Sequence, residues 1–355
     1  MKSMRYRLLG NSGLKVSELC LGAMTLGENP GWGAGAEESR KIADAFRARG
    51  GNFIDTANKY GSGSSEKIVG EIIREDRDAW VVATKFTLSM KDEDPSASGN
   101  GRKNMVQAVE KSLRRLGTDY IDLFWVHAWD WTTPVDELMR GLDDLVRAGK
   151  ILYIGISDAP AWIVSKANTL AELRGWSRFI GLQIEYSLVE RTVERELIPM
   201  AYYHNIGVLA WAPMAGGVLT GKYTRGHQKD TQREAFNQDR LDERCLSIAR
   251  AVDSIADSIG ASSAQVALRW LMHRAGQIIP IVGSRKLEQI QDCLGVLDME
   301  LSSEALAQLD EVSRISLGFP HEFLTRPFIE QMVYGAKPPS MDLKHAVKIV
   351  SKTGK

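Results

Sequence analysis

The chain has 355 residues, a length that exceeds an average domain but is common for an α/β barrel. Its 44% hydrophobic and 25% charged residues are ordinary for a globular protein with a large buried core. Because 45 basic and 45 acidic residues give a formal net charge of +0, the overall charge attracts neither nucleic acid nor an anionic membrane.

The beginning of the chain and its cysteines indicate a reduced, cytoplasmic setting. The segment MKSMRYRLLG lacks the apolar run of a signal peptide, and no later stretch reaches the length needed to cross a membrane. The three cysteines, Cys20, Cys245 and Cys293, are far apart and form no CxxC pair. They therefore suggest neither a disulfide framework nor a metal site.

Eight short apolar runs recur along the chain, and most lack the alternation of a strand with one face in solvent. Continuous β-branched runs indicate strands that are buried on both faces, as in a parallel sheet covered by helices. The runs are Leu19–Met24, Asn52–Asp55, Trp80–Thr84, Ile121–Val126, Ile151–Ile156, Phe179–Ile184, Gly207–Trp211 and Ile278–Val282.

Amphipathic segments with helical spacing lie between these runs. They include Glu37–Ala48, Ser65–Ile73, Val106–Leu116, Val135–Ala148, Glu194–His204 and Ser262–His273. Eight strand–helix units in series favour a closed (β/α)8 TIM barrel over an open doubly wound sheet. Since no Pro/Ser-rich linker divides the chain, we predict a single domain over residues 1–355, with the barrel at about 16–300.

Four segments fall outside the repeat. Arg5–Glu18 is expected to form a hairpin about the turn GNSG, placed to cap the bottom of the barrel. Lys91–Arg102 is polar and predicts a surface loop near the mouth. Tyr223–Arg244 is a charged insertion and a candidate mobile lid, and the tail, residues 314–355, is long enough to cover an opening or contact a second subunit.

Four reactive side chains lie at or just after predicted strands. Asp55, Lys85 and His127 come at or just after the ends of three successive strands, and Tyr60 follows Asp55 by five positions. In a (β/α)8 barrel, functional side chains gather at the carboxyl ends of the strands, so these four can meet there. They suit carbonyl reduction, because a Tyr acid tuned by Lys and Asp can protonate an oxygen that His orients.

Each of these residues also has a purely structural interpretation. Asp55 is a possible turn or helix cap, and Lys85 can extend its ammonium from a buried strand to solvent. His127 alone is more often a satisfied core histidine, and Tyr60 alone is more often a packing residue with a solvated hydroxyl. Their joint placement at successive strand ends is what favours a catalytic role.

The order of the motifs resembles the aldo-keto reductase superfamily, and its voltage-gated potassium channel β-subunit-like branch more than its aldose reductase-like branch. The similarity runs from Tyr6 to about Leu294 and is carried by GNFIDTANKYG, ATKF, DLFWVHAWD, GISDAP, QIEYSLVER, WAPMAGGVLTGKY and PIVGSRKLEQIQD. The resemblance implies NADPH-dependent reduction of aldehydes and ketones on a barrel. It also assigns the catalytic positions to Asp55, Tyr60, Lys85 and His127.

The resemblance further implies which residues hold the cofactor. Trp211 would stack on the nicotinamide and Ser157 and Gln183 would bind its carboxamide, whereas Asp158 replaces the family's usual Asn or Arg. Cys293 likewise replaces an Asn at the adenine end. The implied set is Gly22, Ala23, Met24, Asp55, Ser157, Asp158, Gln183, Trp211, Ala212, Pro213, Met214, Gly216, Gly221, Lys222, Gly283, Ser284, Arg285, Gln289, Asp292 and Cys293.

Arg285 bears on the choice between NADPH and NADH. A guanidinium binds a 2′-phosphate with charge-assisted hydrogen bonds, and the helix expected at Leu287–Leu294 adds amide donors for an anion. The alternative is that Arg285 and Lys286 are two exposed basic residues near a helix start. We expect NADPH to be preferred and NADH to bind more weakly.

Two nucleotide-binding motifs are incomplete. GSGSSE at Gly61–Glu66 has Glu66 where the third glycine of GxGxxG belongs and follows a loop. GGVLTGK at Gly216–Lys222 fits GxxxxGK, but Tyr223 replaces the Ser or Thr that would hold magnesium. Neither therefore supports a Rossmann domain or a nucleoside triphosphatase.

The substrate is less clearly indicated. Trp32, Phe86, Trp129 and Trp131 are candidates for an aromatic pocket, although each can equally be structural. The predicted function is NADPH-dependent reduction of medium-sized aldehydes or ketones to alcohols, and the alternative is a cofactor-bound regulatory or redox-sensing subunit with slow turnover. A homo-oligomer is compatible with either.

Overall fold

The computed structural model describes residues 2–27, 33–226 and 237–335. Trp32, the middle of the predicted lid and the end of the tail lie outside the described residues. Within the described ranges, no helix is both long and apolar enough to span a lipid bilayer.

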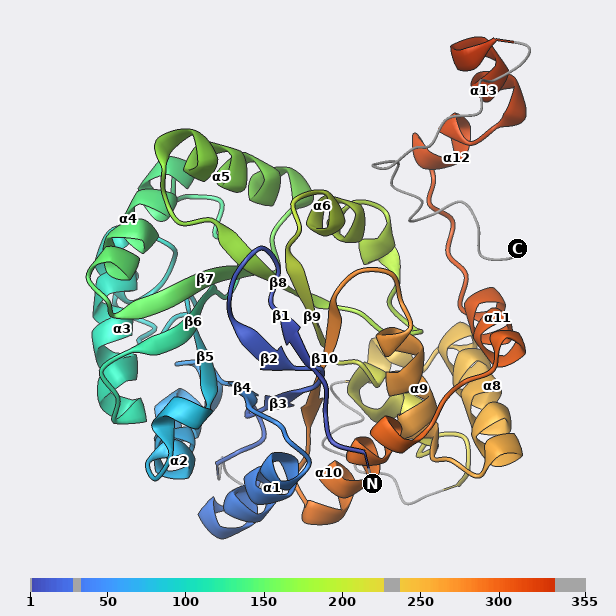
Figure 1. Cartoon of the computed structure of the whole chain (residues 1–355), viewed down its shortest axis with the longest axis horizontal. Coiled ribbons are helices and arrows are strands. Elements are labelled where there is room, and N and C mark those ends of the chain that lie inside the picture. Colours follow the sequence, from blue (N-terminus) through green and yellow to red (C-terminus); the bar gives the residue numbers. More distant parts are fainter. Residues whose placement is uncertain (1, 28–32, 227–236, 336–355) are drawn as a thin grey trace.

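Eight parallel strands close into a barrel in the order β10-β3-β4-β5-β6-β7-β8-β9 (Figure 1). Every predicted run forms one of these strands, which confirms the (β/α)8 prediction. The barrel strands are β3 (Cys20–Gly22), β4 (Phe53–Asp55), β5 (Val81–Phe86), β6 (Ile121–Val126), β7 (Ile151–Ser157), β8 (Phe179–Glu185), β9 (Gly207–Trp211) and β10 (Ile278–Gly283).

Helices surround the barrel, and the six predicted helical segments agree with observed helices to within a few residues. Most of these helices present an apolar stripe to the strands and a polar face to solvent. They are α1 (Ala36–Ala48), α2 (Ser64–Ile73), α3 (Arg102–Leu116), α4 (Val135–Arg147), α5 (Ala161–Arg174), α6 (Leu197–Tyr203), α8 (Glu243–Ile259), α9 (Ser263–Met272), α10 (Leu287–Leu294) and α11 (Ser303–Val312). Two further helices, α12 (His321–Leu324) and α13 (Pro327–Tyr334), belong to the tail.

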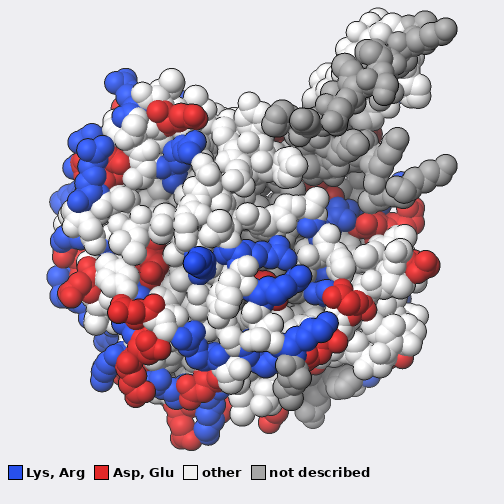
Figure 2. Space-filling view, in the orientation of Figure 1, with Lys and Arg blue, Asp and Glu red and all other residues white. Residues whose placement is uncertain are grey.

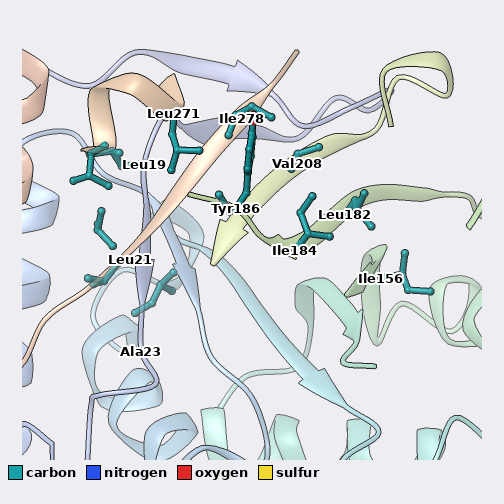
Figure 3. Packing of buried hydrophobic residues seen from close by; sticks show 14 of the residues in the cluster. Leu19, Leu21, Ala23, Ile156, Leu182, Ile184, Tyr186, Val208, Leu271 and Ile278 are labelled. Carbon is teal, nitrogen blue, oxygen red and sulfur yellow. The ribbon is translucent and has the colours of Figure 1, made fainter. Parts of the chain in front are cut away.

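Side chains along each barrel strand alternate between the interior and the helix layer. On β5, Val81 and Ala83 belong to the inner apolar cluster, whereas Val82 and Phe86 belong to the larger cluster between strands and helices. The outer cluster includes Leu19, Leu21, Ala23, Ile156 and Leu182 (Figure 3). This parity decides which strand-end residues point into the barrel.

Trp125 fills the interior of the barrel beside Lys85, its partner on the neighbouring strand. It fits because Gly155 and Gly181 carry no side chain: a Cβ at Gly155 would lie 2.3 Å from the indole, and one at Gly181 2.7 Å. The interior is therefore packed solid below the strand ends, as in other barrels of this class.

The predicted hairpin forms and closes the amino-terminal end of the barrel. Strands β1 (Tyr6–Leu8) and β2 (Lys15–Ser17) pair antiparallel, and the Gly10 N–H donates to Gln277 Oε1 at 2.8 Å, just before β10. The hairpin lies in front of the strands in Figure 1. Lys and Arg side chains gather over the middle of this face, with both signs mixed around its rim (Figure 2). The carboxyl strand ends therefore open on the opposite side.

A buried ion cluster fastens the segment after β8 to α9 and α11. We call Arg191, Glu194, Arg274 and Asp310 the structural ion cluster. Arg191 donates to both Glu194 oxygens at 2.9 and 3.0 Å, and Arg274 Nη1 donates to Asp310 Oδ1 at 2.8 Å. Both guanidinium groups lie over the Trp270 ring, about 5 Å from its centroid. Each guanidinium of the cluster thus faces at least one carboxylate of the cluster.

The described part of the tail leaves the barrel. Helices α12 and α13 project away from it in Figure 1, and Phe319, Met332 and Val333 are largely exposed. Coverage of the barrel mouth by the tail therefore stays a prediction, because residues 336–355 lie outside the described part of the chain.

Candidate active site

The predicted strand-end residues lie together because each occupies a position whose side chain points into the barrel. On β5 the order Val81, Ala83, Lys85 faces inward, and on β6 Leu123 and Trp125 do so, which continues to His127. Asp55 ends β4 beside β5 with the same orientation, and Tyr60 begins the short helix η1 (Tyr60–Gly63) in the loop after it. We call Asp55, Tyr60, Lys85 and His127 the active-site cluster.

Lys85 is the centre of this cluster and has no exposed surface. Its ammonium forms an ion pair with Asp55 Oδ2 and donates to Thr56 O at 2.9 Å and to the Tyr60 hydroxyl at 3.2 Å. The second Asp55 oxygen accepts from Gln183 Nε2 at 3.1 Å. Asp55 and the Thr56 carbonyl thus fix the ammonium where it contacts the phenol.

Burial and charge act in opposite directions in this cluster. Burial alone would lower the pKa of Lys85, but Asp55 and Tyr60 outweigh it and the pKa is raised, so the ammonium stays charged. Burial raises the pKa of Tyr60, and the Lys85 ammonium opposes this shift without reversing it. Tyr60 is therefore a neutral phenol at physiological pH, and the Lys85 ammonium is in place to stabilise its phenolate.

His127 lies against Tyr60, with ring centroids 5.8 Å apart in an edge-on arrangement. Burial, with a smaller contribution from Lys85, lowers the pKa of His127 to about 3, so the imidazole is neutral. Its Nδ1 is buried and has no hydrogen-bond partner among the described residues. A neutral imidazole can donate one N–H to an oxygen without adding a charge.

Two residues that support His127 were not predicted. Thr87 Oγ1 accepts from the His127 backbone N–H at 3.2 Å and donates to Asn100 Oδ1 at 2.6 Å. Asn100 in turn donates to the Ala128 carbonyl at 3.0 Å and is fully buried. The segment Lys91–Arg102 was expected to be a surface loop; its Asn100 instead reaches inward and fixes the backbone around His127.

The residues implied for the nicotinamide end lie around the same opening. Ser157 and Gln183 are register partners on β7 and β8, and Trp211 ends β9. The Trp211 indole N–H donates to Asp158 Oδ1 at 3.0 Å. On the β3 side, Gly22 ends the strand and Met24 is 54% exposed.

Ala23 was predicted to line the cofactor, but its side chain packs in the outer core (Figure 3). The cause is parity, because Gly22 faces inward and the next residue must face the helices. Only the backbone of Ala23 remains available at the opening.

The loop after β9 forms a tight turn suited to a phosphate group. Ala212 and Gly216 have positive φ, and residues 212–226, the described part of the chain directly after β9, contain no α-helix. A Cβ at Gly216 would lie 2.3 Å from Asn237 Oδ1, so only glycine fits against this part of the insertion. Arg240 forms an ion pair with Glu185 at the end of β8. Pro213, Met214, Gly221 and Lys222 belong to the same loop.

The adenosine end differs from the sequence prediction in three respects. Two backbone amides at the start of α10 already have acceptors: Arg285 N–H donates to Gln289 Oε1 and Leu287 N–H to Glu38 Oε1. Asp292 accepts from Ser262 and Gln265 and thereby joins α10 to α9.

Cys293, also predicted at the cofactor, is 4% exposed and packs in the outer core. Burial raises the pKa of its thiol to about 12, which keeps the thiol neutral. It therefore acts as a small apolar residue, and a contact between this position and the cofactor stays a prediction.

The predicted aromatic pocket is only partly supported. Phe86 is fully buried and stacks on Phe124 with centroids 5.0 Å apart, so the prediction that it lines the substrate pocket is wrong. It follows Lys85, which faces inward, so Phe86 faces the helix layer. Trp129 is half-buried beside the opening, and Trp131 is 69% exposed with positive φ. Trp32 lies outside the described residues.

The residues of this opening fit a dinucleotide. Ser284 Oγ, just after β10, is buried without a hydrogen-bond partner in the described structure, and so is His127 Nδ1. A Cβ at Gly283, before Ser284, would make only ordinary van der Waals contact, the nearest atom being the Gly22 carbonyl oxygen at 3.7 Å. The half-buried Arg285 follows and adds a cation to this end of the opening. The same rim thus presents an aromatic plane, a glycine turn and a cation.

Comparisons with known proteins agree with this geometry. The sequence profile of the Aldo/keto reductase family matches residues 18–314. An aryl-alcohol dehydrogenase (NADP+) of Phanerodontia chrysosporium is 38% identical, over 89% of this chain and 88% of the relative. Norsolorinic acid reductase B of Dothistroma septosporum is 36% identical, over 94% and 87% of the two chains. A norsolorinic acid reductase of Aspergillus flavus is 36% identical, over 90% and 84%.

Proposed function

The chain belongs to the aldo/keto reductase family and is an NADP-dependent oxidoreductase, and on that premise we propose that it reduces aromatic aldehydes and ketones, with Tyr60 as the general acid. The observation that carries the proposal is the hydrogen bond from a buried, charged Lys85 to the Tyr60 hydroxyl beside a neutral His127. Relatives named for an aryl alcohol and for norsolorinic acid support an aromatic substrate, as does Trp129 at the opening.

The chain's own residues account for the proton transfer. NADPH, when bound, supplies the hydride. Tyr60 donates its hydroxyl proton to the carbonyl oxygen, and the Lys85 ammonium stabilises the phenolate that remains. Asp55 holds the ammonium in place, and the neutral His127 donates a hydrogen bond that orients the same oxygen.

The implied cofactor contacts divide along the rim of the barrel. Ser157 and Gln183 would bind the carboxamide, and Trp211 would cover one face of the nicotinamide. The loop Pro213–Lys222 would hold the pyrophosphate, and Arg285 the 2′-phosphate. Location in the cytoplasm and assembly with a second copy stay predictions.

The substrate class is tested by NADPH oxidation, followed through its near-ultraviolet absorbance, over matched aromatic and straight-chain aldehydes and ketones. We expect kcat/KM for the aromatic members to exceed that of chain-length-matched aliphatic ones by roughly tenfold or more. Equal or better reduction of the aliphatic members would contradict the aromatic preference and leave carbonyl reduction itself intact.

The role of Arg285 has a separate test by direct binding. Replacing it with Ala removes charge-assisted hydrogen bonds to the 2′-phosphate, which predicts a rise in the Kd for NADPH of roughly 10- to 100-fold. NADH, which lacks that phosphate, should change by less than about twofold. Lys286→Ala, an exposed neighbour, is the matched control, and equal weakening of both cofactors by Arg285→Ala would refute the assignment.

A second candidate is a regulatory subunit with slow turnover, in line with the resemblance to channel β-subunits. The Arg240–Glu185 ion pair favours it, because it ties the end of the insertion across the loop expected to hold pyrophosphate. Measured release rates decide between the two. Release of NADP+ far slower than hydride transfer would support the regulatory subunit, whereas fast multiple turnover would support the reductase.

A further inference from the structure

Asp158 occupies an unusual position at the rim, directly after β7. Its backbone has φ of 45°, a left-handed conformation that Asp and Asn tolerate better than most residues. Its Oδ1 accepts the Trp211 indole N–H at 3.0 Å, and its backbone N–H donates to the Gln183 carbonyl at 3.2 Å. The carboxylate is thereby fixed between two residues implied for the nicotinamide end.

The other charges at this opening are compensated. Asp55 is paired with Lys85, and Glu185 is paired with Arg240. His127 and Tyr60 are neutral. Asp130, on the next loop, directs its oxygens to Thr133 and to backbone amides.

Asp158, in contrast, forms no ion pair with any cation of the described ranges. Its strongest polar contact is the neutral indole of Trp211. Asp158 is exposed at the rim, yet the surrounding protein still removes enough water to raise its pKa, while the indole N–H, Ser157 and the Lys85 ammonium favour its ionised form. Asp158 is therefore a carboxylate at this opening that no cation of the described residues pairs with.

The reaction geometry places the nicotinamide near this carboxylate. The hydride donor and Tyr60 must reach the same carbonyl group, so the ring must lie close to Tyr60. Hydrogen bonds join Asp158 to this site: its backbone N–H donates to the Gln183 carbonyl, and Gln183 Nε2 donates to Asp55 Oδ1 at 3.1 Å. A nicotinamide ring is neutral when reduced and positive when oxidised, so a fixed negative charge beside it distinguishes the two forms.

We propose that the Asp158 carboxylate stabilises the oxidised nicotinamide selectively. The enzyme then binds NADP+ more tightly than an otherwise identical neutral site would, and the bound cofactor has a lower reduction potential. Hydride donation to a carbonyl becomes more favourable, because positive charge develops beside a preorganised carboxylate. This inference rests on the proposed function and its cofactor placement, and adds a preference for the oxidised form of the cofactor.

A purely structural role for Asp158 makes a different prediction. Asn at position 158 keeps an oxygen that can accept from Trp211 and tolerates the left-handed backbone, so Asp158→Asn removes the charge alone. Trp211→Phe does the reverse, since it removes the N–H donor and keeps the carboxylate. If Asp158 served only to orient Trp211, Asp158→Asn would leave cofactor binding unchanged.

The test is the ratio of the Kd for NADP+ to the Kd for NADPH, measured by titration calorimetry without substrate. We expect Asp158→Asn to raise this ratio roughly tenfold, chiefly by weakening NADP+, as expected for a unit charge several ångströms away in a partly solvated site. Trp211→Phe should weaken both cofactors and leave the ratio within about twofold. Asp119→Asn, an exposed carboxylate before β6 at the other end of the barrel, is the matched control.

Each outcome is decisive. A raised ratio in Asp158→Asn alone supports the inference. An unchanged ratio in Asp158→Asn, or an equal change in Asp119→Asn, overturns the inference. In that case the proposed function still stands, provided that the wild-type protein binds the dinucleotides. A wild-type protein that binds neither dinucleotide refutes the proposed function, and the inference falls with it.

Discussion

Two buried ion clusters in this barrel use similar residues for different ends. In the structural ion cluster (Arg191, Glu194, Arg274 and Asp310), matched charges and hydrogen bonds join the segment after β8 to α9 and α11. In the active-site cluster, Lys85 and Asp55 are equally buried, but Tyr60 reaches the opening and His127 Nδ1 lacks a partner among the described residues.

The two clusters differ in whether their polar atoms are left without a hydrogen-bond partner. A buried polar atom without a partner is costly, so a stable fold retains it where a ligand is to bind. The structural ion cluster leaves little capacity for a ligand. The active-site cluster keeps a donor and a neutral imidazole for one, and mutations should separate catalysis from stability accordingly.

The largest effect is expected at Lys85. Lys85→Met removes the cation that stabilises the Tyr60 phenolate, and we predict a fall in kcat on the order of a thousandfold. It also leaves Asp55 without its partner, so the unfolding free energy should fall as well. In the double variant Asp55→Asn/Lys85→Met stability should return while activity does not; recovery of activity there would show that Lys85 acts only through folding.

The matching change in the structural ion cluster should affect stability alone. Arg274→Met leaves Asp310 and Glu194 short of a buried cation and should lower the unfolding free energy by about 3–5 kcal/mol, measured by urea denaturation. The kcat per folded molecule should not change. Arg314→Met removes an exposed ion pair with Glu311 and should have an effect of less than about 0.5 kcal/mol. A large loss of kcat in folded Arg274→Met would remove the distinction between the clusters.

A smaller effect is expected at Asn100, which acts through the backbone at His127. Asn100→Ala removes the hydrogen bond to Ala128 O, and a slightly displaced imidazole should lower kcat roughly tenfold. Glu93→Ala, on the exposed part of the same loop, is the control and should have no effect. If kcat in Asn100→Ala equals that of wild type, His127 is positioned by other contacts.

Titration of His127 is expected to leave the activity unchanged near neutral pH. Since that pKa is lowered to about 3, kcat/KM should show no His127 ionisation between about pH 5 and pH 8. Its unfolded pKa is near ~6.5, so the stability gained from the neutral imidazole is present above that pH and is lost as the pH falls toward the folded value. A break in wild-type kcat/KM near pH 6.5 that is absent in His127→Gln would show that the imidazole is not buried and neutral.

The sequence predicted the barrel and the proximity of Asp55, Tyr60, Lys85 and His127 because both follow from local pattern. Eight apolar runs identify eight strands, and strand ends identify the opening. The same alternation also corrects Phe86, since Lys85 at the preceding position faces inward. The alternation of side chains along β5 could therefore have excluded Phe86 from the pocket, but the pocket prediction did not use it.

Other features depend on contacts that no local pattern contains. Arg191 and Asp310 are far apart in the chain, and Glu38 reaches the start of α10 from α1. Whether Cys293 faces the cofactor or the core depends on how α10 is rotated against its neighbours. Asn100 lies in a polar segment whose composition indicates exposure, and only tertiary packing turns it inward.

The most direct test of the account is the single-turnover rate of aromatic aldehyde reduction by the NADPH complex, compared between wild type and Tyr60→Phe. We predict a fall of about 10²- to 10⁴-fold for Tyr60→Phe, with the Kd for NADPH measured on the same samples unchanged within about twofold. A Tyr60→Phe protein that reduces the aldehyde at the wild-type rate would contradict it.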